Sequence, residues 1–155
     1  MDVVSDINSF GLSYESNAGK HWIFKNLKST DILNVFLTYG VLTNGFIDIP
    51  GNGWGVEVGT RTYLKKEVTK GFYYQNSFNY SNLRFNANGV DGTYSYVSLI
   101  NPDFGYKVKI AKVVNFELNA GFMWRWEMLK GQGNLDNKMF DNLVPKLGVK
   151  LGWIF

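Results

Sequence analysis

The chain has 155 residues, no cysteine and a formal net charge of +3, which bounds it to one domain and excludes disulfides, thiolate catalysis and cysteine-ligated zinc. Its lysines and arginines are spread along the chain, so the charge does not favour nucleic acid as a partner. No segment approaches the roughly 18 to 20 consecutive apolar residues of a membrane-spanning helix, whereas 17% aromatic residues and 17 glycines favour strands and tight turns.

The first predicted strand is 10–15, because residues alternate there with the period of two that separates the two faces of a strand. Its apolar face is Phe10, Leu12 and Tyr14, opposite Gly11, Ser13 and Glu15.

The remainder of the first 30 residues leaves the number of strands open. Either residues 2–8 form a separate short strand, or residues 21–27 form one and 10–15 extends upstream; we favour the second arrangement. A helix from Ser29 to Leu37 is a further alternative, because Ser29-Thr-Asp31 is typical of a helix N-terminus. The Thr-Tyr-Gly-Val sequence that follows argues against the helix.

Four segments in the middle of the chain alternate in the same way. Their mainly apolar rows are Val35, Leu37, Tyr39 and Val41; Trp54, Val56, Val58, Thr60, Thr62 and Leu64; Phe72, Tyr74, Phe78 and Tyr80; and Phe104, Tyr106, Val108 and Ile110. Asn76 is the polar exception in the third row. The opposite rows are mostly polar or charged, which predicts strands with one apolar and one polar face.

The last two predicted strands, 116–128 and 146–155, are the most regular. Their apolar rows are Phe116, Leu118, Ala120, Phe122, Trp124, Trp126 and Met128, and Leu147, Val149, Leu151, Trp153 and Phe155. Neither row contains a lysine or arginine, which would cost about 2–4 kcal/mol if it faced the middle of a bilayer. The pattern therefore predicts a barrel with apolar side chains outside and polar ones inside.

The connections are predicted to alternate in length. Residues 64–72 and 110–116 are short turns, whereas 45–53, 83–102 and 129–142 are expected to be long loops. Short periplasmic turns and long external loops are typical of outer-membrane barrels, whose termini both lie in the periplasm. That arrangement requires an even number of strands, so we expect eight.

The alternating row that ends on Phe155 resembles the assembly signal of bacterial outer-membrane β-barrel proteins. Together with the segments Gly55–Leu64 and Gly71–Tyr74, it makes residues 8–155 similar to small barrels of the OmpX and OmpA-transmembrane-domain kind, and to short "outer membrane protein beta-barrel" domains. The resemblance implies an all-β, eight-stranded, antiparallel up-and-down transmembrane barrel in the outer membrane of a Gram-negative bacterium. Residues 1–6 lack the features of a secretory signal, so we expect a mature chain whose leader has been removed.

Charged residues on the polar rows are expected to share the barrel interior: Glu15, Glu57, Arg61, Lys107, Lys109, Glu117, Arg125, Glu127, Lys146 and Lys150. Eight strands leave a lumen just wide enough for side chains to fill. Because an unpaired buried ion is costly, these groups should pair and form a polar plug. The alternative is a narrow path for solutes or ions, as in a porin-like protein.

No catalytic, cofactor or metal site is predicted. His21 is the only histidine, and Ser16 and Glu15 are the neighbours that a weakly supported hydrolytic site would use. The spacing of Asp136 and Asp141 does not match a calcium-binding loop.

We therefore expect a non-enzymatic integral outer-membrane protein with a structural or interaction role, one form of which is an accessory subunit of a larger outer-membrane complex. The expected partners are outer-membrane lipids and lipopolysaccharide, the barrel-assembly machinery and that larger complex. Two alternatives are a narrow passive channel and a soluble lipocalin-like carrier with its apolar faces turned inward around a ligand.

Overall fold

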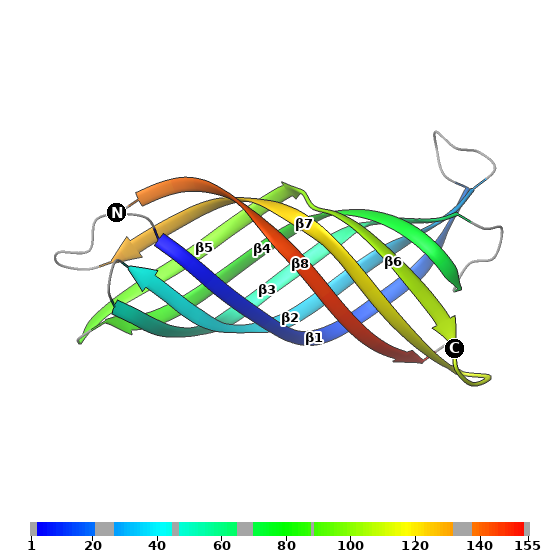
Figure 1. The fold of residues 1–155 in the computed structure, drawn as a ribbon, viewed down its shortest axis with the longest axis horizontal. Helices are drawn as coiled ribbons and strands as arrows, with labels where there is room; N and C mark the ends of the chain where they lie inside the picture. The colour runs from blue at the N-terminus through cyan, green and yellow to red at the C-terminus, as the bar shows by residue number, and fades with distance from the viewer. Residues whose placement is uncertain are drawn as a thin grey trace.

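The computed structural model describes residues 3–20, 27–44, 47–64, 70–87, 89–131 and 138–153, which form an antiparallel sheet curled into a barrel (Figure 1). The strands are β1 (Val3–Lys20), β2 (Lys28–Asn44), β3 (Ile47–Tyr63), β4 (Gly71–Ala87), β5 (Val90–Ile100), β6 (Pro102–Lys109), β7 (Val114–Gly131) and β8 (Lys138–Trp153). None of the described residues forms a helix with the length and apolar character to cross a membrane. The predicted all-β antiparallel architecture is confirmed.

The start of the chain forms one long strand, β1, which pairs with β2 from Val3 to Lys20. Residues 10–15 therefore extend upstream, as the favoured arrangement predicted, and residues 2–8 are not a separate strand. The alternative helix at 29–37 is wrong, because this segment lies in β2 and alternates between exposed Leu33 and Val35 and buried Asn34. Most of the predicted strand at 21–27 lies outside the described residues, and Leu27 is not in a strand.

β5 and β6 lie end to end in a single row between β4 and β7. β5 pairs with residues 79–87 of β4, and β6 pairs with residues 71–76 of the same strand. Because of this break, β4, β5, β7 and β6 form a closed ring of paired strands, which is the only such ring among the described residues. The sheet thus has seven rows, and the predicted eight-membered ring is not formed by the pairings of the described strands.

The break between β5 and β6 explains Asn76, the polar residue within the apolar part of the outward row of β4. At Asn101 the row leaves regular strand geometry, and its backbone N–H donates to Asn76 Oδ1 at 3.2 Å. The Asn101 side chain in turn donates to Ser77 Oγ at 2.9 Å. Asn76 therefore accepts a hydrogen bond from a backbone group that the interrupted ladder leaves without its usual partner.

The predicted loops 45–53 and 83–102 are wrong, because both are mainly strand. β4 and β5 continue to a tight hairpin in which Gly89 has a φ of 82° and its N–H donates to Asn86 Oδ1 at 2.9 Å. The third predicted loop, 129–142, is reduced by β7 and β8 to residues 132–137, which lie outside the described residues. The predicted short turn after residue 110 is confirmed by the Ile110 N–H donating to the Val114 carbonyl at 2.9 Å.

The barrel has two zones along its axis. Over most of its length the outward residues are apolar and exposed, including Leu118, Trp124, Leu147 and Leu151. At the end that carries the β4–β5 hairpin the pattern inverts: Arg84 and Asn86 face outward, and apolar side chains form a core. That core is Ile49, Leu83, Phe85, Tyr94, Tyr96, Met123 and Leu129. Because polar residues take the outward positions here, the segment 83–102 lacks the outward apolar row of the other strands and was predicted to be a loop.

Candidate functional site: the ionic interior

The inward side chains of seven strands, β1 to β4 and β6 to β8, meet in a network of buried charges and hydrogen bonds. Its centre is Arg61 of β3, whose side chain is about 1% exposed. The guanidinium donates through Nη1 and Nη2 to both carboxylate oxygens of Glu117, each at 2.9 Å, and through Nη1 to Glu15 Oε2 at 2.9 Å. This two-pronged contact with Glu117 is the strongest geometry available to an arginine–carboxylate pair.

The carboxylates of Glu15 and Glu117 also accept hydrogen bonds from neutral groups. Tyr63 Oη donates to Glu15 Oε1, and Tyr73 Oη donates to Glu117 Oε1, both at 2.7 Å. Lys107 Nζ donates to Glu15 Oε2 and lies 3.6 Å from Glu117 Oε2. The Tyr73 ring also lies under the guanidinium of Arg61, with 4.0 Å between Cζ and the ring centroid. Each carboxylate is thus compensated by several donors, which offsets the cost of burying it.

A second cluster is centred on Glu57 and is nearer to the hairpin end. Glu57 accepts hydrogen bonds from Asn34 Nδ2 at 2.8 Å and Ser77 Oγ at 2.5 Å, and it pairs with Lys146 Nζ at 3.0 Å. Lys146 also lies 2.7 Å from Asp103 Oδ2. Gln75 joins the two clusters, because its Oε1 accepts from Arg61 and its Nε2 donates to Glu57 Oε1 at 3.1 Å.

The remaining predicted lumen charges have different surroundings. Arg125 and Glu127 are buried beside the apolar core, and Arg125 Cζ lies 4.4 Å from the centroid of the Tyr96 ring. Lys150 is half-buried, 3.8 Å from Glu117 Oε1. Lys109 is exposed, so the prediction that it lies inside is wrong. It is the last residue of β6, where an inward direction leads out of the barrel mouth.

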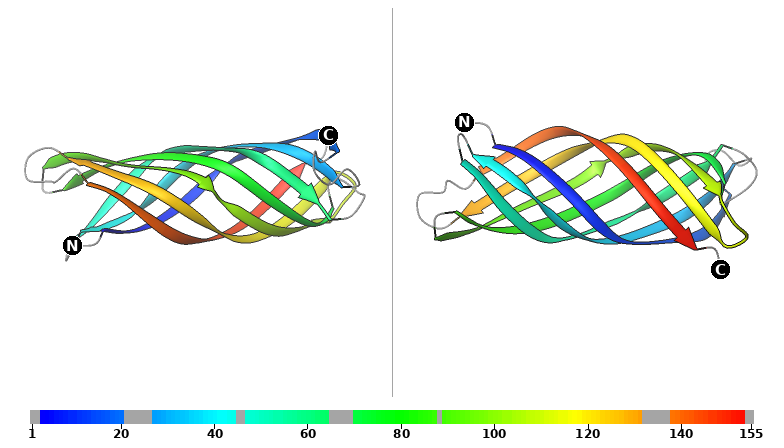
Figure 2. Two further views of the ribbon diagram at one scale, coloured as in Figure 1. Left: turned by 90° about the horizontal axis from the view of Figure 1, so that it is seen from above. Right: turned by 60° about the horizontal axis from the view of Figure 1, so that its bottom comes forward.

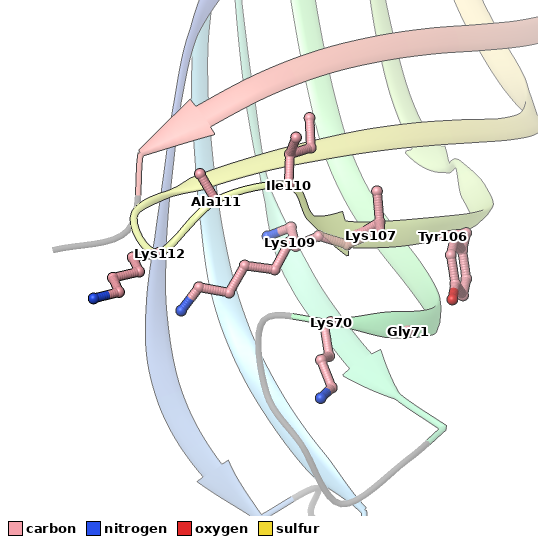
Figure 3. A pocket seen from close by; sticks show the side chains of 9 residues that line it. Lys70, Gly71, Tyr106, Lys107, Lys109, Ile110, Ala111 and Lys112 are labelled. Carbon is pink, nitrogen blue, oxygen red and sulfur yellow. The ribbon is translucent and has the colours of Figure 1, made fainter.

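A pocket at the mouth opposite the hairpin end is lined by lysines. The side chains of Lys70, Lys109 and Lys112 extend from the strand ends and turns there (Figure 3). Lys107 lines the inner side of the same pocket but is held by the carboxylates of the network. The mouth is therefore cationic, in contrast to the charge-balanced interior behind it.

The residues of the predicted assembly signal are only partly described. Leu147, Val149 and Leu151 face outward and are between 65% and 85% exposed. Trp153 ends β8 but its side chain is not described, and Phe155 lies outside the described residues, as does His21. No three histidine, aspartate or glutamate side chains in the described part of the chain lie close enough together to hold a metal ion.

Sequence reasoning missed Asp103, which is fully buried, and the neutral members Tyr63, Tyr73 and Gln75. Asp103 lies on the polar row opposite Phe104, so the alternation of apolar and polar residues could have placed it inside. The tyrosines could not, because an aromatic residue on an inward row is equally compatible with packing and with hydrogen bonding to a carboxylate.

Glycines on the inward rows make room for these large side chains. Gly105 of β6 pairs directly with Tyr73 of β4, and a Cβ added at Gly105 would collide with the Tyr73 ring. Gly55 is related in the same way to Phe36, as is Gly92 to Phe85. The narrow interior is thus filled by placing a residue without a side chain opposite a bulky one.

Replacing Gly105 with alanine is expected to lower the free energy of unfolding by about 1–3 kcal/mol, because the new methyl group displaces the Tyr73 ring from Arg61 and Glu117. Urea unfolding of the refolded protein, followed by tryptophan fluorescence, measures this. The control is Ala120→Val on the outer face, where a change within about 0.5 kcal/mol is expected. Equal losses in both variants would contradict the role of Gly105.

Comparison of the chain with protein-family models, with curated proteins and with solved structures finds no match.

Proposed function

We propose that the protein is a non-enzymatic integral outer-membrane β-barrel protein with a structural or interaction role and a lumen closed by its own ion pairs. The observation that supports this best is the outward apolar band. It runs from Trp54 to Leu64 in β3, from Phe116 to Trp126 in β7 and from Leu143 to Leu151 in β8. Each stretch matches the roughly 9 to 11 residues of a transmembrane strand.

Aromatic side chains lie at both limits of this band, as expected at the interfaces of a bilayer. Trp54 packs against Tyr80 near the hairpin end, with 5.5 Å between the ring centroids. Towards the lysine-lined mouth, Phe72 packs against Tyr106 at 4.6 Å. The strands are longer than the band, and the extra residues form the polar-skinned hairpin end, which we assign to the cell exterior.

The alternative of a soluble carrier requires the reverse arrangement. Its ligand would be enclosed by the apolar rows, but Leu147 is 85% exposed while Glu117 is 2% exposed. An exposed apolar surface of this extent is unfavourable in water and favourable in hydrocarbon. The membrane proposal therefore accounts both for the exposed apolar side chains of the outward rows and for the buried charged side chains of the inward rows.

Carbonate and high-salt washes of membranes containing the protein test this proposal. We expect the protein to stay in the membrane fraction and to be released only by detergent, because the outward band is predominantly apolar. Release by carbonate alone would contradict a membrane-spanning barrel and favour the carrier.

The closed lumen distinguishes a structural role from a passive channel. The Arg61 network connects side chains of β1, β3, β4, β6 and β7 across the interior. We expect no discrete single-channel openings when the protein is reconstituted in planar bilayers. Regular openings in the unaltered protein would favour the channel.

An accessory role predicts a stable complex with a larger outer-membrane protein. Purification in mild detergent is expected to retain such a partner, which is lost as the detergent is made harsher. A monomer without a partner at every detergent strength would contradict the accessory role while leaving the membrane location intact.

A further inference from the structure

The first and last rows of the barrel run side by side without being paired to each other (Figure 2). Among the described residues β1 pairs only with β2, and β8 pairs only with β7. Seven antiparallel rows bring β1 and β8 into the same direction. Direct closure would therefore be parallel, whereas a single strand placed between them would be antiparallel to both.

We propose that this seam, the gap between β1 and β8, is a docking site for one extended strand of a partner polypeptide, with apolar residues facing lipid and uncharged residues facing the lumen. The inference rests on the proposed membrane location. In hydrocarbon every unpaired backbone N–H or C=O costs several kcal/mol, so two open edges there require a partner. A strand added to an exposed edge satisfies them with main-chain hydrogen bonds.

The lumen beside the seam has room for side chains of an added strand. On β1 the inward residues Ser9, Gly11 and Ser13 are exposed, and on β8 the inward Gly148 is half-buried. Inward residues far from the seam, such as Gln75, are buried. Among the described inward residues between the two mouths, the lining is thus least complete where β1 and β8 face each other.

The charge of the interior determines the chemistry of the occupant. The inward acids are Glu15, Glu57, Asp103, Glu117 and Glu127, and the inward bases are Arg61, Lys107, Arg125, Lys146 and Lys150. Among the described side chains five acids balance five bases, so a charge on the added strand would be unpaired in the lumen. Its lumen-facing residues should therefore be uncharged.

A second copy of the chain fits the seam poorly. Copies inserted in the same direction present edges that run the same way, so a β8–β1 contact between copies would again be parallel. Pro145 adds a local constraint, because it has no N–H to donate, and it leaves Lys146 to Trp153 as the longer uninterrupted stretch of the β8 edge. We expect the added strand to pair most regularly with that part of β8.

A synthetic peptide of residues 28–44 is a suitable probe for the seam. This sequence pairs antiparallel with β1 in the barrel, and its inward residues Thr30, Ile32, Asn34, Phe36 and Thr38 are uncharged. The protein is refolded into phosphatidylcholine vesicles with the fluorescently labelled peptide. The control peptide carries Val35→Pro and Leu37→Pro, which remove ladder hydrogen bonds.

Cysteine pairs report the spacing of the seam, since the chain has no cysteine of its own. Cysteines replace one of Phe10, Leu12 and Tyr14 in β1 and one of Leu147, Val149 and Leu151 in β8, so that nine pairs cover the unknown register. A disulfide needs Cα atoms within about 7 Å, whereas an intervening strand separates the edges by roughly 9–10 Å.

We expect the 28–44 peptide to bind at one copy per protein and to raise the urea midpoint of unfolding. It should also lower the yield of any β1–β8 disulfide at least tenfold. The proline-containing control peptide should have none of these effects. Vesicle-inserted protein that forms the disulfide equally with and without the peptide, or that forms intermolecular disulfides between copies, would overturn the docking site. Protein that fails to enter the vesicles would instead overturn the proposed membrane location.

Discussion

Replacing Arg61 with alanine is expected to lower the free energy of unfolding by about 3–5 kcal/mol, because the change removes the guanidinium that contacts both the half-buried Glu15 and the buried Glu117 and leaves Lys107 as the cation they share. Urea unfolding and refolding in detergent micelles or vesicles measures the loss. In planar bilayers the same variant should show current where the unaltered protein shows none, because the central group of the plug is removed.

Two comparisons isolate the ion pair from the size of the deleted side chain. Lys109→Ala removes a cation that is exposed at the mouth, and we expect a change within about 0.5 kcal/mol. The double variant Arg61→Gln with Glu117→Gln should lose less stability than the sum of the single changes, since it leaves no charge of this pair unmatched. Strictly additive losses would contradict a coupled network.

An arginine placed in the outward band should destabilise the protein only in a bilayer. Val58 lies at the middle of the β3 stretch and is exposed, so Val58→Arg is expected to cost about 2–4 kcal/mol of folding free energy in vesicles. The measurement is the urea midpoint in phosphatidylcholine vesicles.

The matched control is Asn86→Arg at the polar-skinned end, where the side chain is already exposed and the expected loss is limited to about 1 kcal/mol, from its hydrogen bonds with Asp91 and Gly89. If Val58→Arg and Asn86→Arg behave alike in vesicles, the outward band does not face hydrocarbon. That result would refute the membrane proposal itself.

The direction in which each side chain points was predictable, because alternation assigns residues to the two faces of a strand without knowledge of the register. It placed Glu117 and Arg125 inside and Leu118 and Trp124 outside, as the structure does. Height along the axis was not predictable from alternation. Lys109 shares its inward row with Lys107 but lies at the mouth of the barrel, in the last pair of the β6–β7 ladder, and only the strand pairing reveals the difference.

The number of rows and the partners within the network could not be predicted either. The expected loop at 83–102 resulted from the inverted zone, where Leu83 and Phe85 face inward and the polar residues between them face outward. The contact between Glu15 and Arg61 joins residues 46 positions apart in the chain. It depends on the combined register of β1, β2 and β3, which no local pattern specifies.

If the barrel spans a membrane, as proposed, the polar outer surface of the hairpin end gives insertion a direction. Asn86 and Asp91 at the tip of the β4–β5 hairpin are joined by a hydrogen bond of 2.8 Å and lie beyond the apolar band. For the barrel to span, this tip has to be carried through the hydrocarbon, while the lysines at the other mouth can stay on the side of arrival. The adjoining ends of β2 and β3 and of β7 and β8 lie at this same end and would have to cross with it. We therefore expect translocation of this end to be the slow step of insertion. When the protein is added to the outside of vesicles, the hairpin tip should lie inside in nearly every copy.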